Sequence, residues 1–97
     1  MTIKEQIDHR ERQLLVNACL YYKMSTNLIS DYSYDKYSFD LDRLIKKYPD
    51  DFKKSVYYKD FVDFNPSSGY YLHYNKPEIV NVANRLVRYH KNLKDID

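Results

Sequence analysis

The chain has 97 residues, of which twelve are tyrosine and only one is glycine, and its 16 basic and 14 acidic side chains leave a net charge of +2. This length predicts one domain, residues 1–97, built around a single modest core. The near balance of charge falls short of the strongly basic composition typical of dedicated nucleic-acid binders. One cysteine and three scattered histidines exclude an internal disulfide and a cysteine-rich zinc site.

The sequence also lacks the patterns that enzymes of common classes need. A single glycine, Gly69, cannot build the glycine-rich loops that hold phosphate groups. No spacing of Ser, His, Asp or Cys suggests nucleophilic catalysis, so we expect neither enzyme activity nor a metal site. The longest apolar stretch, residues 14–22, is too short to span a bilayer. Because residues 1–6 lack the apolar segment of a signal peptide, we expect a cytoplasmic protein.

The first predicted helix covers about residues 3–24. It opens with a capping-box pattern, in which Thr2 and Glu5 satisfy each other's backbone donors. Apolar residues then recur at helical spacing and form two adjacent stripes. Their members are Ile3, Ile7, Leu14, Ala18 and Tyr21 in one stripe and Leu15, Cys19 and Tyr22 in the other. This pattern predicts that both tyrosines and a chemically inert Cys19 thiol are buried, whereas the charged residues 8–12 are solvated.

Two further helices are expected, separated by a less regular middle. The apolar spacing predicts a helix over about residues 33–48, capped by Ser30, Asp31 or Ser33 and stopped by Pro49. These residues supply that spacing: Tyr34, Tyr37, Leu41, Leu44, Ile45 and Tyr48. Residues 50–64 fit either short helical turns or the start of a strand near residues 56–58.

The last helix is expected over about residues 77–94, with Pro77 in its first turn and His90 on its apolar face. Before it, residues 65–69 have the composition of a turn and residues 70–74 that of a short extended segment. The fold class is therefore a mainly α, small helical domain with three main helices and at most a minor β element.

One cluster combines tyrosines and aspartates where two helices meet. Because the connection between the first two helices is only about ten residues long, the second helix must turn back along the first. Two aromatic rings at the end of one helix then face two carboxylates at the start of the other. The cluster consists of Tyr21, Tyr22, Asp31, Tyr34 and Asp35. Aromatic faces attract a cation, and carboxylates accept hydrogen bonds from hydroxyl or amide groups. Such a pocket suits a flat, cationic, hydroxyl-bearing ligand, although ordinary helix capping beside a tyrosine-lined core would give the same spacing.

A resemblance sharpens this hypothesis. Residues 20–35 read LYYKMSTNLISDYSYD, and the helix that follows ends in Tyr48-Pro49-Asp50. These features, in this order, resemble the N-terminal Ia domain of bacterial NAD⁺-dependent DNA ligases over about residues 11–50. The resemblance implies a helical hairpin that holds the nicotinamide mononucleotide (NMN) half of NAD⁺. It also implies that the five residues of the cluster contact this ligand.

The second half of the chain, residues 51–97, departs from the ligase pattern. The chain has no Lys-x-Asp-Gly motif, and the lysine of that motif is the one that accepts AMP in the ligase family. We therefore expect a non-catalytic binding module with NAD or NMN as its ligand, and not a ligase.

Two other tyrosine pairs support an alternative function. Tyr57-Tyr58 and Tyr70-Tyr71 lie outside the resemblance, and tyrosine offers a large rigid contact area to a protein partner. Tyrosine replacing phenylalanine in a small core is the structural alternative. Lys, Asn, Ile and Tyr make up more than a third of the chain, a composition typical of AT-rich phage genomes and mobile elements. The alternative is therefore a small protein-binding inhibitor or adaptor that acts on host replication or defence machinery.

A third possibility rests on the basic residues of the last helix. Arg85, Arg88 and Lys91 can form a solvated face, or they can contact phosphate groups or an acidic partner. A nucleic-acid contact of this kind would weaken steeply with salt.

Overall fold

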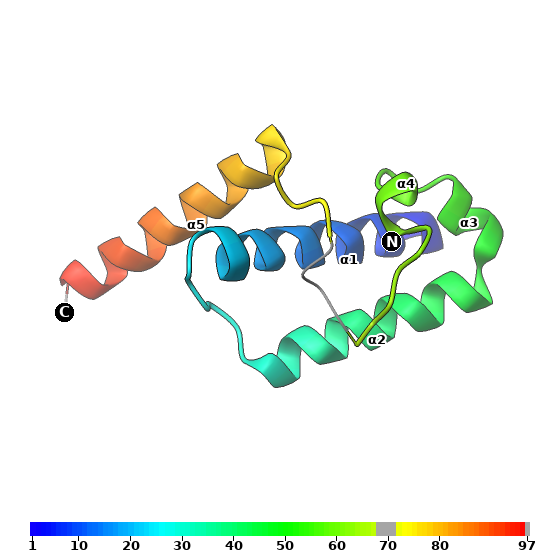
Figure 1. Ribbon diagram of the computed structural model, residues 1–97, viewed down its shortest axis with the longest axis horizontal. Coiled ribbons are helices and arrows are strands. Elements are labelled where there is room, and N and C mark those ends of the chain that lie inside the picture. The colour runs from blue at the N-terminus through cyan, green and yellow to red at the C-terminus, as the bar shows by residue number, and fades with distance from the viewer. Residues whose placement is uncertain (68–71, 97) are drawn as a thin grey trace.

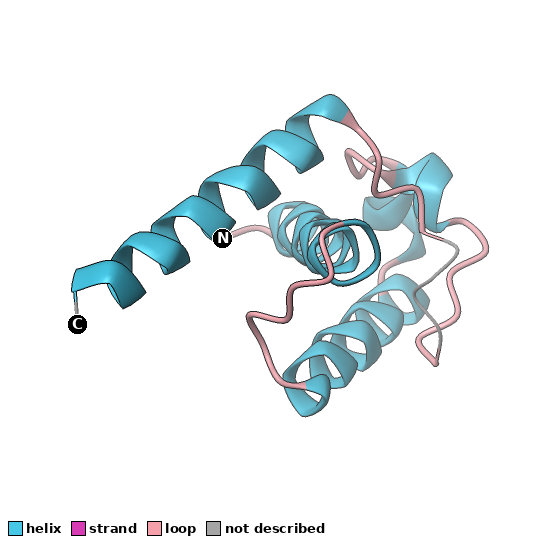
Figure 2. Ribbon diagram, turned by 60° about the vertical axis from the view of Figure 1, so that its left-hand side comes forward, coloured by secondary structure: helices cyan, strands magenta, loops and turns pink. Residues whose placement is uncertain are grey.

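The computed structural model of the chain describes residues 1–67 and 72–96. In chain order the elements are α1 (Ile3–Ala18), the π-helical turn η1 (Cys19–Lys23), α2 (Asp31–Lys47), α3 (Pro49–Lys53), α4 (Tyr58–Phe61) and α5 (Pro77–Ile96). Helix α1 lies in the middle, and α2 and α5 flank it on different sides (Figures 1 and 2). The short helices α3 and α4 lie beside the N-terminal half of α1 (Figure 1). The molecule is elongated, with extents of 46 × 23 × 23 Å.

The mainly α prediction is confirmed, because the described residues form helices and loops without a strand. The predicted helices over 3–24, 33–48 and 77–94 correspond to α1 with η1, to α2 and to α5. Helix α2 begins at Asp31, because the Ser30 hydroxyl caps it by accepting a hydrogen bond from the Ser33 amide at 3.1 Å. Of the predicted extended segment, residues 70 and 71 lie outside the described residues, and residues 72–74 form no strand.

In the middle of the chain the helical alternative is correct and the strand near residue 56 is wrong. Pro49 ends α2 and occupies the first turn of α3, where its missing amide hydrogen costs nothing. Phe52 and Phe61 then place one buried ring each from α3 and α4 into the core. The full core cluster consists of Ile7, Leu14, Leu15, Val16, Ala18, Cys19, Leu20, Leu41, Phe52, Tyr57, Phe61, Leu72, Ile79 and Ala83.

The prediction that residues 8–12 are all solvated is wrong at Glu11, whose side chain is fully buried. Glu11 follows Ile7 by four residues, so it lies on the buried stripe of α1. Its two carboxylate oxygens accept hydrogen bonds from the Ser55 hydroxyl at 2.9 Å and from the Tyr57 amide at 3.2 Å. Asp8, one turn earlier, accepts from the Val56 amide at 2.8 Å. The two carboxylates therefore hold the connection between α3 and α4 against α1.

Burial raises the pKa of the Glu11 carboxyl to about 7, and the hydrogen bonds from Ser55 and Tyr57 offset only part of that rise. The negative charges of Asp8 and Asp60 raise this pKa further.

The expectation that His90 packs on an apolar face is also wrong. His90 is exposed, because the C-terminal half of α5 projects beyond the other helices (Figures 1 and 2). Among the α5 side chains that the structure describes, Ile79 and Ala83 in the first turns are the fully buried ones and enter the core.

Candidate functional site: an aromatic and acidic cleft

The turn η1 determines how the first tyrosine pair is presented. At Cys19 the α-helix gives way to a π-helical turn, in which the Met24 amide donates to the Cys19 carbonyl at 3.2 Å. The extra residue in this turn rotates the residues that follow out of the buried stripe of α1. Tyr21 and Tyr22 are 55% and 43% exposed, so the prediction that they are buried is wrong, whereas Cys19 is buried as predicted. The π turn thereby converts two expected core rings into surface rings.

The loop after η1 reverses the chain. Ser25 adopts the left-handed conformation, with φ of 50°, which ends the helical path. The Thr26 amide donates to the Leu20 carbonyl at 2.8 Å, and the Thr26 hydroxyl donates to the Met24 carbonyl at 3.0 Å. Helix α2 can then return along α1, so that its first turn lies near η1 (Figure 1).

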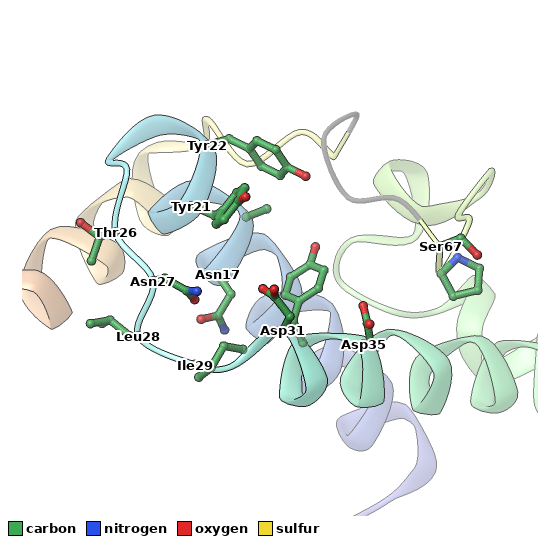
Figure 3. A pocket seen from close by; sticks show the side chains of 13 residues that line it. Asn17, Tyr21, Tyr22, Thr26, Asn27, Leu28, Ile29, Asp31, Asp35 and Ser67 are labelled. Atoms are coloured by element: carbon green, nitrogen blue, oxygen red, sulfur yellow. The ribbon is translucent and has the colours of Figure 1, made fainter.

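A cleft of about 360 Å³ opens between η1, this loop and the first turns of α2 (Figure 3). Its walls are Asn17, Ala18, Tyr21, Tyr22, Thr26, Asn27, Leu28, Ile29, Asp31, Tyr34, Asp35, Pro66 and Ser67. All five residues of the predicted cluster are among them. Figure 3 shows the carboxylates of Asp31 and Asp35 extending from α2 into the space that Tyr21 and Tyr22 border from the other side. The structure therefore brings together the aromatic and acidic groups that the sequence suggested.

The tyrosine pair is held in place from outside the cleft. The rings of Tyr21 and Tyr22 meet edge to face, with centroids 4.9 Å apart and an angle of 82°. The Tyr22 ring also stacks on Tyr74, from the segment before α5, at 6.0 Å and 18°. Next to it, the Lys23 ammonium donates to the Asn75 side-chain carbonyl at 2.6 Å. These contacts fix the tyrosine wall before any ligand arrives, which lowers the entropic cost of binding.

The cleft is negatively charged. Asp31 and Asp35 are exposed, and neither lysine nor arginine is among the described residues that line it. Asp31 lies in the first turn of α2, where the helix dipole stabilises a carboxylate by about 0.3–1 kcal/mol. Both exposed carboxylates are therefore placed where a cationic ligand in the cleft can reach them.

Sequence reasoning missed several lining residues. Asn17 precedes Tyr21 by one helical turn, so its position could have been inferred from helical spacing. Asn27 lies in the loop between the predicted ligand contacts Tyr22 and Asp31, so it could have been included in the candidate site. Pro66 and Ser67 approach from a distant part of the chain, and no local signal places them there.

The tyrosines predicted to contact a protein have different fates. Tyr57 is 6% exposed and belongs to the core, and its hydroxyl donates to Glu78 at 3.2 Å. The Tyr58 ring is half-buried and packs edge to face on Phe52 at 4.8 Å. Tyr57-Tyr58 is thus a packing element and not an exposed contact surface, which corrects the prediction for this pair. Tyr70 and Tyr71 lie outside the described residues.

The predicted basic residues lie on the projecting half of α5. Arg85 and Arg88 are exposed, whereas the Lys91 side chain lies outside the described part of the structure. Among the described residues no group of three or more His, Cys, Asp or Glu is arranged to hold a metal ion. Within the same residues, no helix has the length and apolar character needed to cross a membrane.

Comparison with family models, curated proteins and solved structures gives no match to this chain.

Proposed function

We propose that the chain is a non-catalytic module that binds the nicotinamide end of NAD⁺ or NMN in the aromatic and acidic cleft. One observation carries the proposal. Five residues, chosen because their order along the chain resembles the ligase Ia domain, line a single cleft although they come from two different helical elements. The resemblance and the cleft geometry are independent supports, because the cleft is defined by the packing of the chain and not by the motif.

The chemistry of the cleft suits an oxidised nicotinamide. The pyridinium ring is flat and cationic, so it is attracted to the faces of tyrosine rings such as Tyr21 and Tyr22. The carboxylates of Asp31 and Asp35 offset the positive charge and accept hydrogen bonds from the ribose hydroxyls or the carboxamide. A volume of about 360 Å³ is near the lower end of the roughly 300–1,000 Å³ typical of ligand sites. That size suits a mononucleotide better than a whole dinucleotide.

The electrostatics also limit which part of the nucleotide is held. With two carboxylates and no basic side chain among its described lining residues, the cleft repels a phosphate group. The ring and the ribose are therefore the recognised parts, and the phosphate extends into solvent. Nicotinamide riboside, which lacks the phosphate, should then bind at least as tightly as NMN.

Isothermal titration calorimetry with four ligands tests the proposal: NMN, nicotinamide riboside, NAD⁺ and reduced NMN, whose ring is uncharged. We expect the oxidised mononucleotide to bind about fivefold more tightly than the reduced one, because the cation–π contribution of about 1 kcal/mol is lost on reduction. Absence of heat or of ligand NMR line broadening at millimolar ligand would contradict the proposal. So would equal affinity for the two redox forms.

Two variants with matched controls locate the binding. Asp31→Asn removes one charge from the cleft, and Asp63→Asn removes a carboxylate that is also exposed but does not line it. Tyr22→Leu removes an aromatic face, and Tyr32→Leu removes a ring that is 79% exposed and outside the cleft wall. Only the first member of each pair should weaken binding.

A further inference from the structure

A second concavity adjoins the aromatic and acidic cleft but is not lined by the five predicted ligand residues. It is a groove of about 370 Å³ between α1, the loop before α2 and the side of α5. Its walls are His9, Arg12, Gln13, Val16, Asn17, Leu20, Leu28, Ile29, Val82 and Leu86. Six of these ten residues are aliphatic, and four of the six come from the loop and α5, so the two sides of the groove are more apolar than the helical face between them.

The shape of the groove matches a helix. The residues that α1 contributes, together with Leu20 of η1, recur every three or four positions from His9 onward, which places them on a single face of this continuous helical segment. Eleven residues of α-helix advance about 17 Å, so the floor accommodates roughly three turns of a second helix laid along it. The loop residues Leu28 and Ile29 form one wall, and Val82 and Leu86 form the other.

The α5 wall continues beyond the part of α5 that other helices cover. Leu86 is 40% exposed and Tyr89 is 65% exposed, and they extend the stripe that begins at Val82. Figures 1 and 2 show this half of α5 projecting past the end of η1, with its flank open. The groove and the projecting stripe therefore form one continuous apolar surface, here called the α5 groove.

The charges beside the α5 groove are basic. Arg12 lines it, and the only formally charged residues between Val82 and His90 are Arg85 and Arg88, both exposed. Glu78, the acidic residue one turn before Val82, already accepts a hydrogen bond from the Tyr57 hydroxyl. A second copy of the chain would bring its own Arg85 and Arg88 to this rim, and like charges across an interface oppose association.

We propose that the α5 groove binds an amphipathic α-helix of a partner protein, with its apolar stripe against the apolar sides of the groove and acidic side chains along its edges. This is the helix-in-groove mode of recognition, in which apolar anchors recur every three or four residues. The concave shape favours a helix over a flat membrane surface. The apolar sides of the groove favour a protein over a nucleic acid, whose phosphates need basic contacts along their whole path. The groove shares Asn17, Leu28 and Ile29 with the aromatic and acidic cleft, but none of the five predicted nucleotide contacts lines it. The proposal therefore does not require nucleotide binding in the cleft.

Two synthetic peptides test the charge and the shape together. Both are 18-residue amphipathic helices with leucine along one face; one carries glutamate on the flanks and the other carries lysine. In fluorescence anisotropy at 50 mM salt, we expect the full chain to bind the acidic peptide about tenfold or more tightly than the basic one. Raising the salt should narrow this difference, because the rim charges are exposed.

Variants assign the binding to the groove. Leu86→Glu places a charge in the apolar wall and should lower the affinity for the acidic peptide by about tenfold or more. The matched control is Phe39→Glu, at an apolar residue of α2 that is 50% exposed and lies outside the groove, and it should leave binding unchanged. Arg85→Glu combined with Arg88→Glu should reverse the preference toward the basic peptide. Because the four substituted side chains are all exposed, circular dichroism should show unchanged helix content in these variants.

Other outcomes would overturn the proposal. If neither peptide saturates the chain at millimolar concentration, the groove does not bind a helix with useful affinity. Equal binding of both peptides would contradict the charge selectivity. Self-association in sedimentation experiments that Leu86→Glu abolishes would assign the surface to a second copy. Binding of a DNA duplex that is lost in the double arginine variant, with no peptide binding, would assign it to nucleic acid.

Discussion

Tyrosine and acidic residues lie close together in two regions along α1, and they are exposed in one region and buried in the other. At the C-terminal end of α1, Tyr21 and Tyr22 are partly exposed and face two exposed carboxylates across a cleft. In the middle of α1 the Glu11 carboxylate is buried, and Tyr57, whose amide donates to it, is buried too. Tyrosine and acid in proximity therefore do not indicate a ligand site by themselves. Burial and backbone hydrogen bonds decide whether the pair holds the fold together or is available to a ligand.

The hydrogen bonds around Glu11 explain why this carboxyl belongs to the structure. The Ser55 hydroxyl has one proton and two acceptors within reach, the Phe52 carbonyl at 2.6 Å and Glu11 at 2.9 Å. When Glu11 is protonated, its own hydroxyl donates to Ser55, and Ser55 then donates to Phe52. When Glu11 is ionised, Ser55 can donate fully to only one of the two acceptors. The Ser55 donor lowers the pKa of Glu11 only in part, so burial still leaves this pKa at about 7.

The largest expected contrast is between the buried and the exposed tyrosine. Tyr57→Ala should lower the free energy of unfolding by about 3–4 kcal/mol, since a buried aromatic ring is lost and a cavity remains. Tyr22→Ala should cost about 1 kcal/mol, because the ring that is removed is partly exposed and contacts Tyr21 and Tyr74 at the surface. Urea unfolding followed by circular dichroism measures both values. Equal losses of unfolding free energy would contradict the difference in burial between Tyr57 and Tyr22.

This contrast also shows how much of the molecule could be predicted. Helical spacing and capping residues predicted the three main helices, and a local motif predicted the five residues that share the cleft. The errors arose where a distant segment decides the outcome. Nothing near Glu11 in the sequence indicates that Ser55 and Tyr57 will supply its hydrogen bonds. Similarly, helical periodicity cannot detect the π turn that moves Tyr22 to the surface.

The next largest effect is a dependence of stability on pH that comes from Glu11. Its pKa rises from 4.5 to about 7 on folding, so the folded chain binds this proton more tightly than the unfolded chain does. The stabilisation is therefore fully present below pH 4.5 and is lost as the pH rises through about 7. We expect the free energy of unfolding to fall by about 2–3 kcal/mol between pH 5 and pH 8.

Glu11→Gln is the matching control for the pH dependence. Its amide nitrogen can donate to Ser55 and its carbonyl can accept from the Tyr57 amide, so both hydrogen bonds are kept without a titratable proton. The variant should be more stable than the native chain at pH 8 and should lose most of the slope between pH 5 and pH 8. An unchanged slope in this variant would assign the pH dependence to other groups.

A smaller effect is expected at Ser55. Ser55→Ala should destabilise the chain by about 1 kcal/mol, because a hydrogen bond to a buried group is lost. The same change removes a donor that lowers the pKa of Glu11, so the midpoint of the pH dependence should move upward. Carbon-13 NMR of the Glu11 carboxyl, recorded during a pH titration, measures that midpoint directly. A downward shift would contradict the hydrogen-bond arrangement described above.

The smallest effect on stability is expected from the acidic wall of the cleft. Asp31→Asn combined with Asp35→Asn should change the free energy of unfolding by less than about 1 kcal/mol, because both side chains are exposed and only Asp31 interacts with the start of α2. The same double variant should lose most of its affinity for oxidised NMN. If the two carboxylates served mainly to stabilise the fold, the double variant would lose much stability and keep its affinity for NMN. Glu11→Ala should show that pattern. A pair of acids that contributes little to stability and much to affinity is what distinguishes a ligand site from a structural hydrogen-bond network.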